Sequence, residues 1–466
     1  MAVTKKIQFK SDQFQKAAAA LCAEFQNRGF EIYWVGGAVR DLILKRPNFD
    51  LDLATSASPA EIKRVARELG LRSFEIGEKF GTVGILLQGR RLELTSFRAE
   101  KGYVDSRHPS KVRFGVSAEF DAGRRDFTVN ALFYDPVSGE LKDFHGGLQD
   151  LAKKQLRFVG NAAKRIKEDP LRCLRAVRFA TTLKFKIAPA DLRAIKKSAA
   201  LVKKISGERI KQELDKLLAV ENFMHGIRLL DTSGLLAAIF PEVARLKKVR
   251  QSKNYHAEGN VFVHTMLVLE NLQSEDLLMR YAGLLHDIGK YQMGRKTVKE
   301  GRPHISFSGH AQKSGEMILK IARRLHFSRT ETQKLYYLAL HHMDLRPIEM
   351  LRQATLIRWS KNPWFADLVR LRIADSLGAI QTSASGKVVK KEMGDWQRLL
   401  AKVKRWQKPQ PEKIIDGRDV MRVLKLKPGK RVGEILDEIY ILQRQGKIKT
   451  REQGITFLKS LDKRKG

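Results

Sequence analysis

The chain of 466 residues is 43% hydrophobic and 8% aromatic, which excludes an intrinsically disordered protein and suggests three or four domains. Lysine and arginine number 89 against 51 aspartates and glutamates, which gives a formal net charge of +38. This charge favours a polyanionic partner. Nucleic acid fits better than a membrane, because no polybasic block adjoins a lipid-anchoring helix.

The two cysteines, Cys22 and Cys173, lie far apart without metal-type spacing, so we expect no disulfide framework and a reducing compartment. The sequence shows no apolar core of signal-peptide length at its N-terminus and no run of membrane-spanning length. We therefore expect a cytoplasmic protein with no membrane partner.

Two helices are predicted near the start of the chain. Apolar residues at helical spacing indicate the first, over Asp12–Arg28. Ser58 is a suitable N-cap for the second, which has Pro59 at its first position and continues to about Leu69.

Between these helices, the stretch Tyr33–Ala54 carries the strongest functional signal. It contains the glycine pair Gly36-Gly37, a short helix over Val39–Leu44, and Asp50-Leu51-Asp52. A strand over Phe49–Leu53 would place both aspartates on one face. Paired carboxylates suit Mg²⁺, which proteins commonly hold together with substrate phosphates, and glycines let the backbone approach a phosphate. The stretch therefore predicts a metal-dependent phosphoryl- or nucleotidyl-transfer site in preference to a solvated acidic turn.

Two strand-like runs follow, Gly81–Leu87 and Arg91–Arg98, joined by a tight turn. Glu93, in the second run, is either a third carboxylate facing the same metals or an outward strand residue. The polar stretch Ala99–Lys111 predicts an irregular loop, and a loop of this length is usually functional.

Polar side chains suited to a nucleotide occur further on. The segment Phe120–Phe133 contains arginines that suit phosphates and an asparagine that suits a sugar or base, or these residues form surface salt bridges. Asp169 and Arg172, read as one helical turn apart, would present a hydrogen-bonding edge to a nucleobase, unless Asp169 only caps the helix. We interpret the helix that starts at Ser206 as mainly structural.

Several segments, taken in their order along the chain, resemble the bacterial tRNA nucleotidyltransferase and poly(A) polymerase family of the polymerase-β superfamily. They are GGAVRD with DLD, RRDFTVNAL, DFHGGLQDL, EDPLRCLRAVRFA and SGERIKQEL. The resemblance covers roughly the first half of the chain. It implies an α+β fold in which a nucleotidyltransferase head with a small mixed sheet precedes all-α neck, body and tail regions. The implied activity is template-independent addition of CCA, from CTP and ATP, to the 3′ end of tRNA.

The resemblance also implies residue roles. Asp50 and Asp52 would hold two magnesium ions, with Glu93 as the third carboxylate. The triphosphate motif would consist of Gly36, Gly37, Arg40 and Asp41. The segment that handles the ribose would consist of Arg124, Arg125, Asp126 and Asn130. The protein template would consist of Asp169 and Arg172, with Arg175 and Arg178 as supporting arginines. The segment between Arg98 and Arg113 is similar to the flexible loop associated with A addition.

A second constellation of ligand-type residues follows Asn254, all in helical patterns: His264, His286, Asp287, His310, His341, His342 and Asp375. Imidazoles and carboxylates that converge from several helices suit a transition-metal hydrolytic site. The LLHDIGK segment resembles the central motif of the HD phosphohydrolase domain. That resemblance implies His264, His286, Asp287 and Asp375 as first ligands.

The resemblance to the HD domain also implies ligands for a second metal, namely His310 and one of the adjacent histidines His341 and His342. Of these two, we favour His342. The metal would be Mn²⁺, Ni²⁺, Fe²⁺ or Mg²⁺. The implied activity is that of a phosphatase or 2′,3′-cyclic phosphodiesterase acting on RNA ends; a degenerate domain kept for structure is the alternative.

The predicted domains are a head over 1–155, a neck and body over 156–250, an HD domain over 251–380, and a linker with helical tail over 381–466. Within the last, Gln381–Lys391 is expected to be a polar linker. Gly417–Lys459 is expected to be a tail with two helices, the second over Val432–Gln445. Tail lysines and arginines would contact the tRNA backbone.

Several alternatives stay open. The loop argues against CC-only addition and the HD domain against a poly(A) polymerase, whereas CCA addition and A-only addition are not distinguished. An HD-type nucleotide hydrolase and a non-enzymatic tRNA-binding protein are further alternatives. No protein partner is implied, and the oligomeric state is undetermined.

Overall fold

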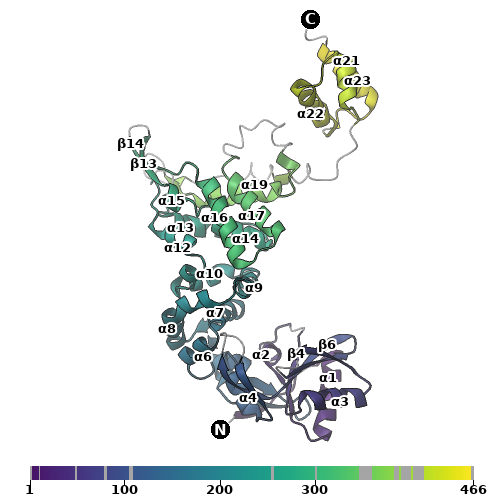
Figure 1. Cartoon of the computed structure of the whole chain (residues 1–466), viewed down its shortest axis with the longest axis vertical. Helices are drawn as coiled ribbons and strands as arrows, with labels where there is room; N and C mark the ends of the chain where they lie inside the picture. The colour runs from purple at the N-terminus through teal and green to yellow at the C-terminus, as the bar shows by residue number, and fades with distance from the viewer. Residues whose placement is uncertain are drawn as a thin grey trace. The chain divides into compact units, whose positions relative to one another are not determined.

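The computed structural model describes residues 3–9, 11–47, 50–77, 81–103, 109–252, 257–299, 302–345, 359–382, 388–389, 400–401, 403, 414–444 and 446–462. The chain forms two compact units, Met1–Ala244 and Arg245–Gly466, each described by itself below (Figure 1). Within the described ranges, no helix has the length and apolar character that crossing a membrane requires.

The first unit is built on an eight-stranded sheet with the strand order β1-β10-β9-β2-β3-β6-β5-β4. The strands are β1 (Val3–Lys6), β2 (Ile32–Val35), β3 (Asp52–Thr55), β4 (Arg72–Gly77), β5 (Thr82–Leu87), β6 (Arg90–Ser96), β9 (Leu132–Tyr134) and β10 (Glu140–Asp143). In this sheet β3 and β6 pair in parallel and the other neighbours pair antiparallel, so the expected mixed sheet is confirmed.

Helices pack on the sheet, whose strands β2 and β9 are buried throughout. The helices α1 (Gln13–Asn27) and α3 (Pro59–Glu68) pack against it, and both begin with a capping box; Ser58 is the N-cap of α3, as the sequence predicts. The short helices α2 (Gly37–Ile43) and α4 (Ala118–Arg124) lie near β2 and β9, followed by the 3₁₀ turn η2 (Thr128–Asn130). The core under α4 includes Tyr33, Phe97 and Phe133.

Two local predictions in the head are wrong in detail. The strand that contains the second aspartate begins at Asp52, and the expected first residue, Phe49, lies outside the described residues. The predicted alternation holds nevertheless, since Leu51 and Leu53 are buried and both aspartates are exposed. The stretch expected as an irregular loop forms an antiparallel pair, β7 (Arg98–Tyr103) with β8 (Pro109–Phe114), because pairing between the two strands extends a polar segment whose local preference is weak; 104–108 lie outside the description.

The rest of the first unit is helical except for one parallel pair of two-residue strands. Its elements are α5 (Gly147–Ala152), β11 (Gln155–Leu156), α6 (Ala162–Glu168), α7 (Leu171–Leu183), β12 (Lys186–Ile187), α8 (Pro189–Ser198), η3 (Ala199–Lys204), α9 (Gly207–Leu218), α10 (Phe223–Thr232), α11 (Leu235–Ile239) and, at the division, α12 (Pro241–Arg245). The helix α7 packs closely on α9, which brings α9 beside the residues that follow Pro170.

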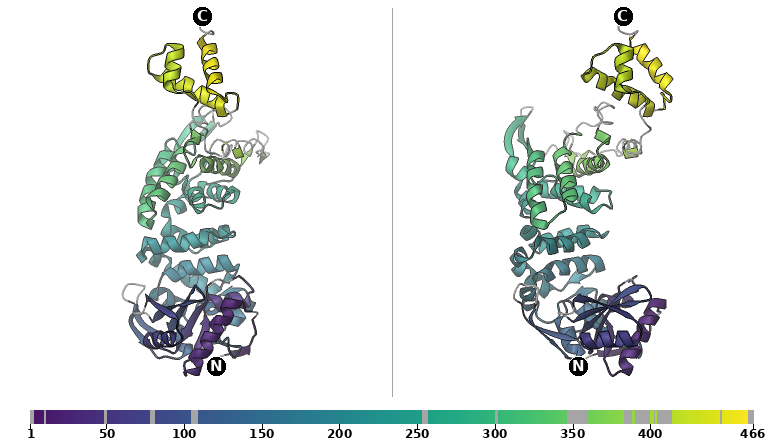
Figure 2. Two further views of the ribbon diagram at one scale, coloured as in Figure 1. Left: turned by 90° about the vertical axis from the view of Figure 1, so that its right-hand side faces the viewer. Right: turned by 45° about the vertical axis from the view of Figure 1, so that its right-hand side comes forward.

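The second unit contains a bundle in which α13 packs on α19 and α16 packs on α17 (Figure 2). Its elements are η4 (Leu246–Lys248), α13 (Val261–Asn271), α14 (Leu277–Leu285), α15 (Lys290–Met293), β13 (Arg295–Lys299), β14 (Arg302–Ser306), α16 (His310–Leu325), α17 (Arg329–His341) and α19 (Phe365–Gly378). The helical character is confirmed, with the addition of the β13–β14 hairpin.

The end of the chain also differs in detail from the prediction. In the stretch expected to be a polar linker, β15 (Gln381–Thr382) pairs with β16 (Val388–Val389). The described tail has three helices where two were expected: α21 (Gly417–Leu424), α22 (Lys430–Arg444) and α23 (Arg451–Asp462). They enclose a small apolar core of their own that includes Val420, Ile435 and Leu458.

Candidate active sites

Three carboxylates gather at the centre of the head sheet. Asp52 pairs with Glu93 across the parallel strands β3 and β6, so these side chains project from the same face, and Asp50 precedes β3. Although part of the Asp52 side chain is accessible to solvent, the surrounding protein desolvates its carboxylate and raises its pKa; Arg125 opposes this shift and Asp50 adds to it. Burial, Asp52 and Asp50 also raise the pKa of Glu93. The trio therefore carries repulsion that a divalent cation would relieve.

The glycine pair beside these carboxylates is required by geometry. Gly36 has a φ of 70°, and a Cβ added there would lie 3.3 Å from Nη1 of Arg125 and 3.7 Å from Oδ2 of Asp52. A Cβ at Gly37 would lie 3.3 Å from Nη2 of Arg40. The backbone turn is thus pressed against the side chains of the site, and a larger residue would displace them.

A chain of hydrogen bonds connects the predicted triphosphate segment with the predicted ribose segment. Arg40 donates from Nε and Nη2 to the two oxygens of Asp41, at 2.9 and 2.8 Å, and from Nη1 to Oδ1 of Asn130, at 2.6 Å. Asn130 in turn donates to Asp126 at 3.1 Å. The sequence prediction that these residues belong to one site agrees with this network, although their roles stay predictions.

The network continues into the helical region. Arg175 donates from Nε and Nη2 to Oδ2 of Asp126, at 2.8 and 2.6 Å. Burial tends to raise the pKa of Asp126, but Arg175 and Asn130 outweigh it and lower this pKa to about 2. Arg178 donates to Glu213 of α9 at 2.6 Å. An ionised Asp126 therefore links the head to α7.

Asp121 was missed by the sequence analysis. This fully buried carboxylate accepts from Nε of Arg124 at 2.7 Å and from Nη2 of Arg125 at 3.0 Å. Arg125 also lies over the ring of Phe133, 4.9 Å from its centroid. Asp121 thereby orients both predicted nucleotide-binding arginines. The signal was available, because Asp121 lies three and four residues before them in a helix.

The structure places the predicted base-reading pair differently from expectation. Asp169 ends α6 and Arg172 lies in the first turn of α7, because Pro170 separates the two helices. Asp169 accepts from Nη2 of Arg209 at 2.9 Å and from the backbone N–H of Leu171 at 3.0 Å. The prediction that both residues occupy one face of a single helix is therefore wrong.

Arg172 is held by its own set of partners. Its Nη1 donates to Oε2 of Glu168 at 2.8 Å and to the backbone carbonyl of Arg165 at 3.0 Å. The helix α9 supplies both Arg209 and Glu213, which pair with residues of the candidate site, and the interpretation of this helix as mainly structural stays a prediction. Neither residue had a partner visible from sequence spacing, because the contacts cross from α9 to other elements.

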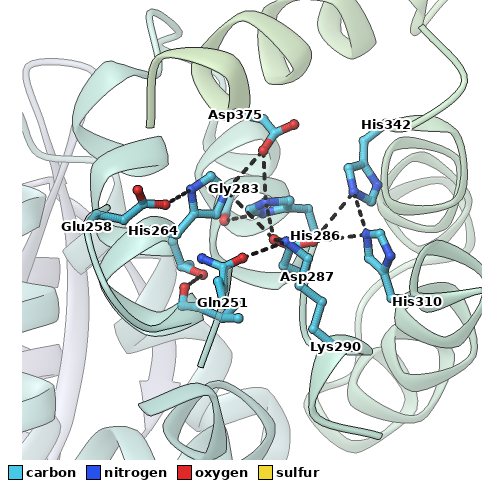
Figure 3. A network of polar contacts seen from close by, with 12 residues as sticks. Gln251, Glu258, His264, Gly283, His286, Asp287, Lys290, His310, His342 and Asp375 are labelled. Atoms are coloured by element: carbon cyan, nitrogen blue, oxygen red, sulfur yellow. Dashed lines mark hydrogen bonds and ion pairs between the residues drawn. The ribbon is translucent and has the colours of Figure 1, made fainter. Parts of the chain in front are cut away.

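In the second unit, the predicted ligands form two buried clusters (Figure 3). His264, His286 and Asp375 form the first cluster. The second consists of Asp287, His310 and His342. Within each cluster the ligand-type atoms lie within 4.8 Å of one another, the arrangement that a metal ion needs.

Asp287 faces both clusters. Its Oδ2 lies 3.3 Å from Nε2 of His286 and 3.7 Å from Nε2 of His264. Its Oδ1 lies 3.2 Å from Nε2 of His310 and 3.6 Å from Nε2 of His342. A single carboxylate with one oxygen toward each cluster is suited to bridge two metal positions.

Of the adjacent histidines His341 and His342, the structure brings only the second into a cluster. His342 is buried, and burial lowers its pKa to about 4. His341 lies 2.7 Å from Oδ2 of Asp344, on the partly exposed side of α17. Successive residues of a helix point about 100° apart, so both could not face the same cluster.

The residues present fit a metal centre. Nε2 of His286 is buried and makes no hydrogen bond to the described residues, although it points at the cluster. A neutral imidazole with a free lone pair is the usual ligand form of histidine. Imidazoles and carboxylates together suit Zn²⁺, Mn²⁺, Fe²⁺ or Ni²⁺, and this donor set does not distinguish among them.

Three domain-family models match this chain. The poly A polymerase head domain matches residues 32–157, the probable RNA and SrmB-binding site of polymerase A matches 184–247, and the HD domain matches 259–390. A CCA-adding enzyme of Streptococcus uberis is 47% identical over 215 residues, which are 46% of this chain and 52% of that relative. A CCA-adding enzyme of Streptococcus gordonii is 45% identical over 224 residues, 48% of this chain and 55% of that relative. The chain thus spans about half the length of the relatives it matches.

Solved structures of CCA-adding enzymes share the fold. That of Bacillus stearothermophilus in complex with CTP has a TM-score of 0.66 at 24% identity, covering 98% of this chain and 99% of that one. That of Thermotoga maritima complexed with tRNA has a TM-score of 0.67 at 19% identity, covering 98% and 99%.

Fold and comparisons together describe a head with a mixed sheet that matches the poly A polymerase head-domain model, followed by helical domains, one of which carries two buried histidine–carboxylate clusters. Residues 32–157 thus match the poly A polymerase head-domain model, and residues 259–390 match the HD domain model.

Proposed function

We propose that this chain adds C, C and A to the 3′ end of tRNA, from CTP and ATP, with Mg²⁺ held by Asp50, Asp52 and Glu93. The observation that carries the proposal is the register of β3 and β6, which sets Asp52 beside Glu93 on one face of the sheet. Relatives named CCA-adding enzymes, 44–47% identical over about half of this chain, favour this activity over poly(A) synthesis.

The other residues of the head would then bind and orient the nucleotide. Bound magnesium would supply activation of the RNA 3′-hydroxyl and neutralisation of the triphosphate. Arg40 and Arg125, both anchored by carboxylates, offer guanidinium groups for phosphates. Asp169 and Arg172 would present an acceptor and a donor to the base, so that no nucleic-acid template is needed.

The same proposal covers the domain organisation and location. We assign 1–155 to the head, 156–250 to the neck and body, 251–380 to the HD domain, and 381–466 to the linker and tail. The tRNA would be held largely through its phosphates, in keeping with the net charge of +38. A cytoplasmic location is proposed from the two widely separated cysteines.

The decisive experiment supplies tRNA that lacks all three terminal nucleotides. CTP alone should extend it by two residues and CTP with ATP by three, as resolved on sequencing gels. Absence of C incorporation, with A added to tRNA that already ends in CC, would replace the proposal with A-only addition. The double substitution Asp50→Ala with Asp52→Ala should abolish every extension product while the protein remains folded.

A second activity is proposed for the HD domain, because two histidine–carboxylate clusters share Asp287. We propose metal-dependent hydrolysis of phosphoesters, with RNA ends bearing a 2′,3′-cyclic phosphate as the substrate class. Hydrolysis of such an RNA with Mn²⁺ or Ni²⁺ should disappear in His264→Ala and persist in the Asp50→Ala, Asp52→Ala variant. A parent protein without hydrolysis under any of these metals would instead identify a degenerate domain.

A further inference from the structure

The four clustered histidines of the HD domain present the same nitrogen to the metal positions. In each, Nε2 faces the cluster, so the Nδ1 atom needs an acceptor elsewhere to hold the proton. Three of them use a carbonyl three residues earlier: Nδ1 of His286 lies 2.9 Å from Gly283 O, that of His310 2.7 Å from Phe307 O, and that of His342 2.7 Å from Ala339 O.

His264 differs from the other three. The carbonyl three residues before it, Val261 O, accepts the hydroxyl of Thr265 at 2.9 Å. Nδ1 of His264 instead lies 3.2 Å from Oε1 of Glu258, whose side chain is 1% exposed. Figure 3 shows Glu258 on the side of His264 away from the cluster. A buried carboxylate therefore occupies the place that a neutral carbonyl takes elsewhere.

Glu258 also connects His264 to the helix that carries another ligand. Its Oε2 accepts from the backbone N–H of Ile380 at 2.9 Å, and Ala257 donates to the carbonyl of Ile380 at 2.8 Å. Ile380 follows α19, the helix of Asp375, by two residues. Asp375 in turn lies 3.0 Å from Nε2 of His264. Glu258 thus fixes the distance between two ligands of the same cluster.

Charge gives Glu258 a second effect. Lys290 lies 2.7 Å from Oδ2 of Asp287, and Arg372 donates to Oδ2 of Asp375 at 2.8 Å. These two cations balance the two carboxylates of the first metal position. The carboxylate of Glu258 restores a net negative charge there, and a carboxylate behind an imidazole also makes the imidazole a stronger donor.

We propose that Glu258 is a positioning residue for the first metal position, where it holds His264 with Nε2 toward the metal and strengthens binding at that position. The proposal rests on the proposed metal site of the HD domain. Loss of the carboxylate should weaken binding at the first position by about 10- to 100-fold, the usual effect of removing a ligand's supporting partner. Binding at the second position, whose histidines rely on backbone carbonyls, should change little.

The test is a Co²⁺ titration of the metal-free full chain, followed by calorimetry and by the visible absorption of the bound ion. Asp50→Asn and Asp52→Asn are introduced throughout, so that the head does not bind Co²⁺. Glu258→Gln should weaken one binding event, and Glu270→Gln, which alters an exposed carboxylate on α13, the helix of His264, should leave both unchanged. Glu258→Asp should bind more tightly than Glu258→Ala, because it keeps the charge.

A double-mutant cycle separates positioning from a general effect on folding. In a His310→Ala background, Glu258→Gln should still weaken the remaining Co²⁺; in a His264→Ala background it should have no further effect. Equal losses in both backgrounds, or equal affinities of Glu258→Asp and Glu258→Ala, would overturn the proposal. If the parent bound no Co²⁺ in the HD domain, the proposed metal site itself would fail, and parent-like affinity in Glu258→Gln would sink only the role of Glu258.

Discussion

The carboxylate of Asp169 is bonded to the guanidinium of Arg209, with 2.9 Å between Oδ2 and Nη2, across the contact between the start of α7 and α9. This bond, together with the N–H of Leu171, determines how Asp169 is presented. The residue assigned to base reading is therefore oriented by a helix that lies 40 positions further along the chain.

Replacing Arg209 with alanine should impair base selection. Asp169 would lose a charge-assisted hydrogen bond, and a bond of this kind contributes about 1.5–3 kcal/mol, or roughly 10- to 100-fold in rate. The rate of C addition from CTP should fall by that factor, measured as single-turnover extension of tRNA lacking CCA. Lys216→Ala, which alters an exposed residue of the same helix, is the matched control. Equal rates for the two variants would contradict the role of Arg209.

Asp52→Asn should separate stability from activity. The pKa of Asp52 is raised by burial and by Asp50, so the ionised side chain disfavours the folded head when no metal is bound. In the presence of a chelator, the melting temperature of the variant should be about 1–2 °C above that of the parent. This shift is smaller than the one produced by a change of about 1 kcal/mol in the free energy of unfolding. Added Mg²⁺ should stabilise the parent and not the variant, and nucleotide addition should be lost. A lower melting temperature in chelator would show that ionised Asp52 does not destabilise the metal-free head.

Asp126→Asn should remove stability in a pH-dependent way. The folded-state pKa of Asp126 is about 2, below the ordinary value of 3.8, so its contribution is complete above about pH 5 and is lost as the pH falls toward 2. At pH 7 the loss should be about 2 kcal/mol in the free energy of unfolding of the head. Urea denaturation monitored by head tryptophan fluorescence at pH 7 and pH 3 should show a smaller difference at pH 3. A difference independent of pH would exclude the ionised carboxylate as its source.

His342→Ala and His341→Ala form a matched pair in the HD domain. Only His342 lies beside Asp287 and His310, at 3.6 and 3.3 Å between the facing atoms. His342→Ala should therefore lower the bound metal by one equivalent per chain, measured by elemental analysis after dialysis. His341→Ala should retain the parent's metal content, since His341 faces Asp344. The opposite result would reverse the assignment of the second metal position.

Much of the candidate chemistry was predictable because it depends on local spacing. The alternation around Leu51 places Asp50 and Asp52 on one side in any extended conformation, and helix caps such as Ser58 are local by nature. The histidines of the HD domain could be predicted as a group from their residue types in helical patterns. Where local preference was weak, as in the polar stretch that forms β7 and β8, the prediction failed.

The sequence alone identified the side chains that we propose carry the chemistry, because residue type sets what a side chain can ligate, donate or ionise. The tertiary structure decided which of them meet. The parallel pairing of β3 with β6 set Glu93 beside Asp52, and the packing of α7 on α9 gave Asp169 its partner. The rotation between successive residues of α17 selected His342 over His341. The partners of Glu93 and Asp169 depend on contacts between elements distant in sequence, and such contacts leave no local spacing to detect.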